Sequence, residues 1–199
     1  MHAPEGVERA LRLRAAAIAG YERDQQRALA LLDDMDPGVR TTALGALVRM
    51  GKAGSDHVAR AMCDSSASAR RHIAELALPL DMANYLPLLA DTDASVVEAA
   101  CFAVGEARDR RAVEDLCRIA SGHLDPLCRE SAVAALGAIG DPAGLPCIMR
   151  GLKDRPAVRR RAVIALAPFD GPEVLSALEQ ALQDRDWQVR QAAEDLLRS

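Results

Sequence analysis

A short residue pattern recurs along most of the chain at a nearly constant spacing. Written as Val-Arg-x-x-Ala-x-x-Ala-Leu, it gives six matches of graded quality, with arginine sites at positions 40, 70, 97, 129, 159 and 190. Successive sites are 30, 27, 32, 30 and 31 residues apart. Similarity at a fixed period is the sequence signature of repeat architectures, in which each unit buries its apolar face against its neighbours. The chain is therefore expected to fold as a stack of similar units.

Each unit is predicted to contain two helices. After every arginine site, apolar residues fall at the third, sixth and seventh positions (+3, +6 and +7), the spacing of one buried helix face. A shorter apolar-periodic stretch precedes each pattern and starts at turn residues such as Asp141-Pro142, because proline is tolerated in a first helical turn. The fold predicted is all-α: a right-handed α-solenoid of about six two-helix repeats plus an N-terminal helix. Within a single domain of residues 1–199, we place that helix at 4–20 and the repeats at approximately 24–51, 54–79, 82–107, 109–140, 142–168 and 171–198.

The composition agrees with a helical stack. Half of the residues are hydrophobic but only 3% are aromatic, and Ala, Leu and Val supply most of the apolar positions. Small side chains favour helices and close helix packing, whereas sheets draw on aromatic and β-branched residues. Position +4 is apolar in five units and is Glu194 in the sixth, so we expect the last repeat to expose one flank.

The turn residues and the anchor pattern together resemble a known family. Two-helix units with an aspartate between the helices and Val-Arg-x-x-Ala-x-x-Ala-Leu on the second helix are similar to HEAT-like repeats, of the short class first associated with phycobilin lyases. The resemblance covers roughly residues 24–198. It implies an Asp/Arg ladder, in which turn aspartates and helix arginines pair within or between units: Asp34, Asp64, Asp91, Asp154 and Asp184 with Arg40, Arg70, Arg129, Arg159 and Arg190.

The ladder pattern is broken at two positions. Val97 occupies an arginine site, and His123 stands where a turn aspartate is expected. We expect the ladder to be weakened there, with either a looser contact between units or no structural effect, since exposed ion pairs contribute little on average.

No motif for catalysis or metal binding is found. The iron-dependent hydroxylases of this repeat class carry His-Glu dipeptides as ligands, and this chain has none. Its four histidines (His2, His57, His72 and His123) have no ligand spacing, and no phosphate-binding glycine motif occurs. We predict no catalytic residue, no metal and no cofactor.

The five cysteines are odd in number and form no Cys-x-x-Cys pair, which is typical of a reduced protein. Cys101, Cys128 and Cys147 are expected on apolar helix faces, and Cys63 is expected to be the most accessible. The apolar run at 15–20 is too short for a signal segment or a membrane span, so we expect a cytoplasmic protein without membrane association.

The solvent-facing positions +1, +2 and +5 of the second helices are predicted to build a concave face that binds a partner. Phe102 and Ile164 are apolar there without a folding role, although a tightly curled stack would bury Phe102. Arginine and aromatic residues are typical interface anchors. Trp187 is expected to close the terminal unit, with an exposed contact as the alternative. The predicted partner-binding residues are Arg71, His72, Glu75, Glu98, Phe102, Glu130, Arg160, Arg161 and Ile164.

The function predicted is a non-enzymatic scaffold that binds a protein or peptide. Net charge is −4 and acidic residues interrupt the basic positions of the face, so binding of nucleic acid, as by the HEAT-like DNA glycosylases, is disfavoured. The first alternative is a cofactor- or chromophore-handling protein resembling phycobilin lyase subunits, and nucleic-acid binding is the second.

Overall fold

A computed structural model describes residues 5–76, 78 and 83–198, and every regular element in that part of the chain is helical. The chain divides into two compact units, Met1–Asn84 and Tyr85–Ser199. His2 and the predicted boundaries at residues 4, 79 and 82 lie outside the described residues. None of the described helices is long and apolar enough to cross a membrane.

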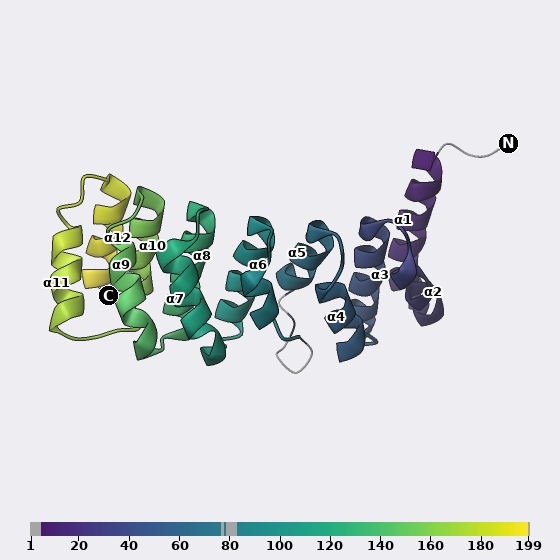
Figure 1. The fold of residues 1–199 in the computed structure, drawn as a ribbon, viewed down its shortest axis with the longest axis horizontal. Coiled ribbons are helices and arrows are strands. Elements are labelled where there is room, and N and C mark those ends of the chain that lie inside the picture. The colour runs from purple at the N-terminus through teal and green to yellow at the C-terminus, as the bar shows by residue number, and fades with distance from the viewer. Residues whose placement is uncertain (1–4, 77, 79–82, 199) are drawn as a thin grey trace. The chain divides into compact units, whose positions relative to one another are not determined.

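The first unit contains two layers of helices (Figure 1). One layer holds α1, α3 and α5, and the other holds α2, the 3₁₀ helix η1 and α4. The bounds are α1 Glu5–Glu22, α2 Gln25–Ala30, η1 Leu31–Asp33, α3 Pro37–Met50, α4 Ser55–Met62 and α5 Ala67–Glu75. The N-terminal helix predicted at 4–20 thus packs on α3 in the place where a second helix would lie.

The second unit repeats the same arrangement (Figure 1). The second helices α6, α8, α10 and α12 pack in series, and α7, α9 and α11 each pack on the second helix that follows them in the chain. The bounds are η2 Leu86–Ala90, α6 Ala94–Glu106, η3 Arg110–Ala112, α7 Val113–Gly122, α8 Pro126–Ile139, η4 Pro142–Gly144, α9 Leu145–Gly151, α10 Pro156–Ala165, α11 Pro172–Ala181 and α12 Trp187–Arg198. The spacing of 27 residues before position 97 is the shortest, and only the five-residue η2 precedes α6 in this unit.

Capping residues define where the second helices begin. Asp36, Asp93 and Asp125 are N-cap residues whose side chains accept hydrogen bonds from first-turn amides. Proline follows directly at the start of α3 and α8, where its missing N–H costs nothing. α3 and α8 both end at a glycine in the left-handed conformation, Gly51 and Gly140.

The core forms along the face that the periodicity predicts. All six residues at position +3 are buried: Ala43, Ile73, Ala100, Ala132, Ala162 and Ala193. Alanine predominates because the second helices approach one another closely. A Cβ atom added to Gly137 on α8 would lie 2.7 Å from the Cα atom of Ala165, and one added to Gly105 would lie 3.0 Å from the Cα atom of Ala135. Small side chains at Gly105, Gly137 and the alanines that they contact therefore set the spacing between second helices.

Asp/Arg ladder pairs connect neighbouring repeats within each unit: Arg40–Asp64 in the first, and Arg129–Asp154 and Arg159–Asp184 in the second. Arg40 donates from Nε and Nη2 to the Asp64 carboxylate at 2.7 and 2.6 Å, and from Nη1 to the backbone carbonyl of Asp34 at 2.7 Å. Arg159 makes the same bonds to the Asp184 carboxylate and to the Asp154 carbonyl. Each arginine thus holds the turn of its own repeat and the carboxylate of the following repeat; we call this connection a rung.

The N-terminal helix contributes a rung that the sequence pattern did not reveal. Arg12 on α1 lies with Nε 2.9 Å from a carboxylate oxygen of Asp34. Arg9 pairs with Asp36 one turn away, at 2.5 Å. Arg12 therefore occupies the place toward Asp34 that Arg40 occupies toward Asp64, although its Nε makes an ion pair without a hydrogen bond.

Val97 and His123, the two exceptions to the pattern, fall on a single rung. Since each rung joins the arginine site of one repeat to the turn site of the next, position 97 would pair with position 123. His123 Nδ1 accepts a hydrogen bond from the Asp125 amide at 3.1 Å, as Asp184 does from the Asp186 amide at 2.8 Å. The histidine therefore keeps the turn while the ion pair is absent, and Gly105 still packs α6 closely on α8.

Cys117 and Cys147 form a disulfide, with Cα atoms 5.5 Å apart. The expectation that all five cysteines are thiols, and that Cys147 is a buried thiol, is therefore wrong. The two residues are separated by 30 positions, one repeat period, and lie on the first helices α7 and α9. Neighbouring first helices bring equivalent positions together, which a search for short Cys-x-x-Cys motifs does not detect.

Candidate functional site

Six of the nine predicted partner-binding residues lie on the second helices of the second unit. We call the +1, +2 and +5 positions of α6, α8, α10 and α12 the partner face. An ion pair crosses between helices on this face, with Arg161 Nη2 3.3 Å from Glu130 Oε1. The face also contains two cavities, one between α6 and α8 and one between α10 and α12.

Phe102 lies at the first cavity and is 55% exposed, so the stack does not bury it. The cavity measures about 300 Å³. Small residues of α8 and the Glu130–Arg161 pair line it beside the phenyl ring; the complete lining is Phe102, Gly105, Glu106, Glu130, Ser131, Ala134, Ala135, Ala138 and Arg161. An apolar ring over small side chains is a shape that can receive a side chain of a partner.

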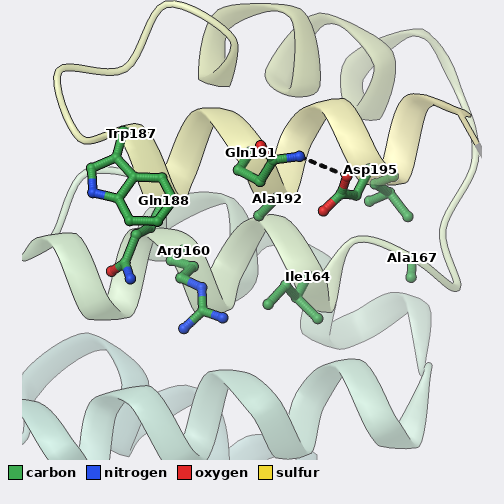
Figure 2. Close-up of a pocket in the computed structure, with 9 residues that line it drawn as sticks. Arg160, Ile164, Ala167, Trp187, Gln188, Gln191, Ala192 and Asp195 are labelled. Atoms are coloured by element: carbon green, nitrogen blue, oxygen red, sulfur yellow. Dashed lines mark hydrogen bonds between the residues drawn. The ribbon is translucent and has the colours of Figure 1, made fainter.

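The second cavity measures about 380 Å³ and is more apolar (Figure 2). Ile164 and Trp187, 41% and 65% exposed, are the large exposed apolar residues that line it. Arg160 lies at the Trp187 end, while Asp195 lies at the opposite end and accepts a hydrogen bond from Gln191 Nε2 at 2.8 Å. Its lining is Arg160, Ile164, Ala167, Trp187, Gln188, Gln191, Ala192, Asp195 and Leu196.

Trp187 is exposed at this cavity, which agrees with the second of the two roles expected from the sequence. It does not close the terminal unit but is the first residue of α12, with its indole exposed beside Arg160 and Gln188 (Figure 2). The residue lies three positions before the sixth arginine site, outside the +1, +2 and +5 set, so the repeat register gave no reason to place it on the face.

The other three predicted residues lie in the first unit on α5. Arg71 Nε donates to Glu75 Oε1 at 2.7 Å, and His72 Nδ1 lies 3.8 Å from the same carboxylate. Residues four positions apart on a helix meet in this way, so this cluster is satisfied within its own helix.

The electrostatics of the partner face are mixed. Arg161 is neutralised by Glu130, and Glu98 on α6 adds another acidic group. A phosphate backbone would need several aligned cations, so this pattern gives no track for nucleic acid.

His57, His123 and the buried cysteines have structural roles. His57 Nδ1 accepts the Gly54 amide at the start of α4, and His123 serves its turn in the same way. Burial raises the pKa of the Cys128 thiol to about 11 and raises that of Cys101 further, whereas Cys63 is an exposed thiol. Within residues 5–76, 78 and 83–198, no group of three or more His, Cys, Asp or Glu side chains has the geometry to hold a metal ion.

The repeat geometry agrees with a comparison against protein families. The family model for HEAT repeats matches residues 83–167 and 144–198, which together span more than half of the chain. The chain belongs to the HEAT repeat family. The fold is accordingly an all-α HEAT-type solenoid, and a search of curated proteins finds no match.

Several solved structures share this fold. YibA of E. coli is 19% identical, with a TM-score of 0.65 over 99% of this chain and 76% of YibA. The CpcE–CpcF complex of phycocyanin lyase from Nostoc is 23% identical, with a TM-score of 0.61 over 87% and 75% of the two chains. A designed armadillo repeat protein in complex with the peptide (KR)4 is 18% identical, with a TM-score of 0.51 over 99% and 95%. At these identities the likeness concerns the fold alone.

Proposed function

We propose that this HEAT repeat protein is a non-enzymatic scaffold whose partner face binds a protein segment. The observation that carries the proposal is the exposure of Phe102, Ile164 and Trp187 at two cavities on one side of the second helices. Large apolar side chains of this kind are not needed for the core of the second unit, because buried alanines at +3 and the buried Val104, Leu136 and Leu166 at +7 already fill it. Aromatic and arginine side chains in pockets are the usual centres of protein interfaces.

A protein of similar fold, the designed armadillo repeat protein, is in complex with the peptide (KR)4. We do not assign the peptide specificity of that protein to this chain, because the charged residues of the partner face have their own arrangement. The exposed apolar groups also favour a protein segment over nucleic acid, for which the face offers no basic track. The cytoplasmic location stays a prediction, and the Cys117–Cys147 disulfide removes the cysteine argument for it.

The test is a selection of peptides from a displayed random library on the full-length protein. Peptides recovered on the wild type are then measured by calorimetry against Phe102→Ala and Leu175→Ala. Phe102 and Leu175 are 55% and 51% exposed, but Leu175 lies on the first helix α11, away from the partner face. We expect Phe102→Ala to weaken binding at least tenfold, since truncating a central interface anchor costs about 2 kcal/mol.

Leu175→Ala should leave the affinity unchanged, and both variants should melt near the wild-type temperature. Equal losses for the two variants, or no loss for Phe102→Ala together with none for Ile164→Ala, would place binding elsewhere on the molecule and contradict the proposal.

A further inference from the structure

The cavity between α10 and α12 has the dimensions of a site for a few side chains. Its volume of about 380 Å³ lies at the small end of the range for ligand sites, about 300–1,000 Å³. Ile164 lines it from α10, and the indole of Trp187 stands at one end (Figure 2). Both side chains expose apolar surface that an aliphatic side chain would cover.

Arg160 is the charged group of this cavity that has no partner. Its two neighbours in sequence are both engaged: Arg159 with the Asp184 carboxylate at 2.7 and 2.8 Å, and Arg161 with Glu130 at 3.3 Å. Within the described part of the chain, no hydrogen bond or ion pair occupies the Arg160 guanidinium. Its five N–H donors are therefore available to an anion, and a guanidinium binds a carboxylate in bidentate fashion.

The opposite end of the cavity carries the opposite charge. Asp195 is held there by Gln191 Nε2 at 2.8 Å, and Ala192 lies between the two ends (Figure 2). An acidic ligand group is thus attracted to the Trp187 end and repelled from the Asp195 end. The charges of Arg160 and Asp195 therefore determine at which end of the cavity a ligand carboxylate lies relative to Ile164.

We propose that this cavity binds an acidic residue and an adjacent aliphatic residue of the partner peptide. The peptide carboxylate pairs with Arg160, and the aliphatic side chain packs on Ile164 and Trp187. The inference rests on the proposed function and adds the chemical class of the partner segment. Charge complementarity with Arg160 is the argument for an acidic segment. The proposed segment is thus opposite in charge to the basic peptide (KR)4 that the designed armadillo protein binds.

The test uses the same displayed library on the wild type, on Arg160→Glu and on Arg110→Glu. Arg110 is the charge-reversal control because it is exposed and lies on η3, outside the partner face, with a long ion pair of 3.7 Å from its Nε to Asp141 Oδ2. We expect wild type and Arg110→Glu to enrich Asp or Glu beside Leu, Ile or Met. Arg160→Glu should enrich Lys or Arg in that place, and its affinity for a synthetic wild-type peptide should fall about fivefold or more, the effect of one partly exposed ion pair.

The single tryptophan of the chain reports where the peptide binds. Binding of the synthetic peptide should shift the Trp187 emission to shorter wavelength, because the indole is covered. Peptides without an acidic preference, an unchanged preference in Arg160→Glu, or binding without a change in Trp187 emission would overturn this inference and leave the proposed function intact. Recovery of no peptide on the wild type would overturn both.

Discussion

Arg129 and Asp154 join two successive repeats through two hydrogen bonds, from Nε at 2.7 Å and from Nη2 at 2.8 Å. The remaining donor, Nη1, bonds the backbone carbonyl of His123 at 2.8 Å. The side chains of the pair are only 15% and 18% exposed. A bidentate, partly buried pair of this kind is stronger than an ordinary surface ion pair.

Asp154→Ala should lower the free energy of unfolding by about 2 kcal/mol, because it leaves the partly buried Arg129 without its carboxylate. Urea denaturation of the full chain measures the change. Asp33→Ala is the control, since Asp33 pairs with Arg60 while 77% exposed, and its loss should have no measurable effect. Equal effects of the two substitutions would show that the ladder is an ordinary surface feature.

The ladder also predicts how stability depends on pH. Hydrogen bonds from Arg40, Arg129 and Arg159 lower the pKa values of Asp64, Asp154 and Asp184 from their ordinary range. A carboxyl whose pKa is lower in the folded than in the unfolded state contributes its full stability above the unfolded value, about 3.9, and loses it as pH falls through the folded value. The midpoint of urea unfolding should therefore be constant from neutral pH to about pH 5 and fall below pH 4.

The wild-type acid loss should be smaller in Asp154→Asn, which removes one of the ladder carboxylates whose pKa is lowered. A variant that lost as much stability in acid as the wild type would contradict the assignment to the ladder.

The ion pair that is absent between positions 97 and 123 can be introduced by two substitutions. Val97→Arg alone should destabilise the protein by about 2 kcal/mol, because it replaces a buried valine and faces His123 rather than a carboxylate. Addition of His123→Asp should recover about 1–2 kcal/mol, a coupling that a double-mutant cycle measures. Strict additivity of the two substitutions would mean that positions 97 and 123 do not form one rung.

Close packing of second helices makes Gly137 a sensitive position. Gly137→Ala should cost about 1–3 kcal/mol, since its Cβ atom would clash with the Ala165 backbone. Gly122→Ala is the control: it lies at the end of α7 with no atom within 4 Å of the added Cβ, and it should be neutral or slightly stabilising. Thermal melts of both variants test the difference.

The disulfide predicts a dependence on reductant. Opening a cross-link between residues 30 positions apart should lower the free energy of unfolding by about 2–4 kcal/mol, with the wild type measured with and without dithiothreitol. The double variant Cys117→Ala/Cys147→Ala should be insensitive to reductant. A wild type whose stability is the same in both conditions would contradict a structural role for the bond.

Much of the fold was predictable from the sequence because it is set by local, repeated signals. The period of the arginine sites, the apolar +3 and +7 positions and the turn aspartates each follow from helix geometry and recur several times. The ladder residues were named from the resemblance to HEAT-like repeats, which left open whether each pair forms within a unit or between units. The packing of two helical pairs determines which turns Arg129 contacts. It bonds both the His123 carbonyl of its own turn and the Asp154 carboxylate of the next.

The partner face was predictable only in part. The +5 register placed Phe102 and Ile164 on the face but left open whether a curled stack buries Phe102. Trp187 lies outside that register, and its exposure depends on where α12 begins relative to α10. The pairing of Cys117 with Cys147 likewise arises from the stacking of α7 on α9.

The sequence alone thus determined the repeat, the helix class and the residues that fill the core, because these depend on contacts within one repeat period. Only the tertiary structure decided which guanidinium is left unpaired, which aromatic ring is exposed and which thiols meet. Those properties depend on the distance between side chains of different repeats, and a one-dimensional pattern does not contain that distance.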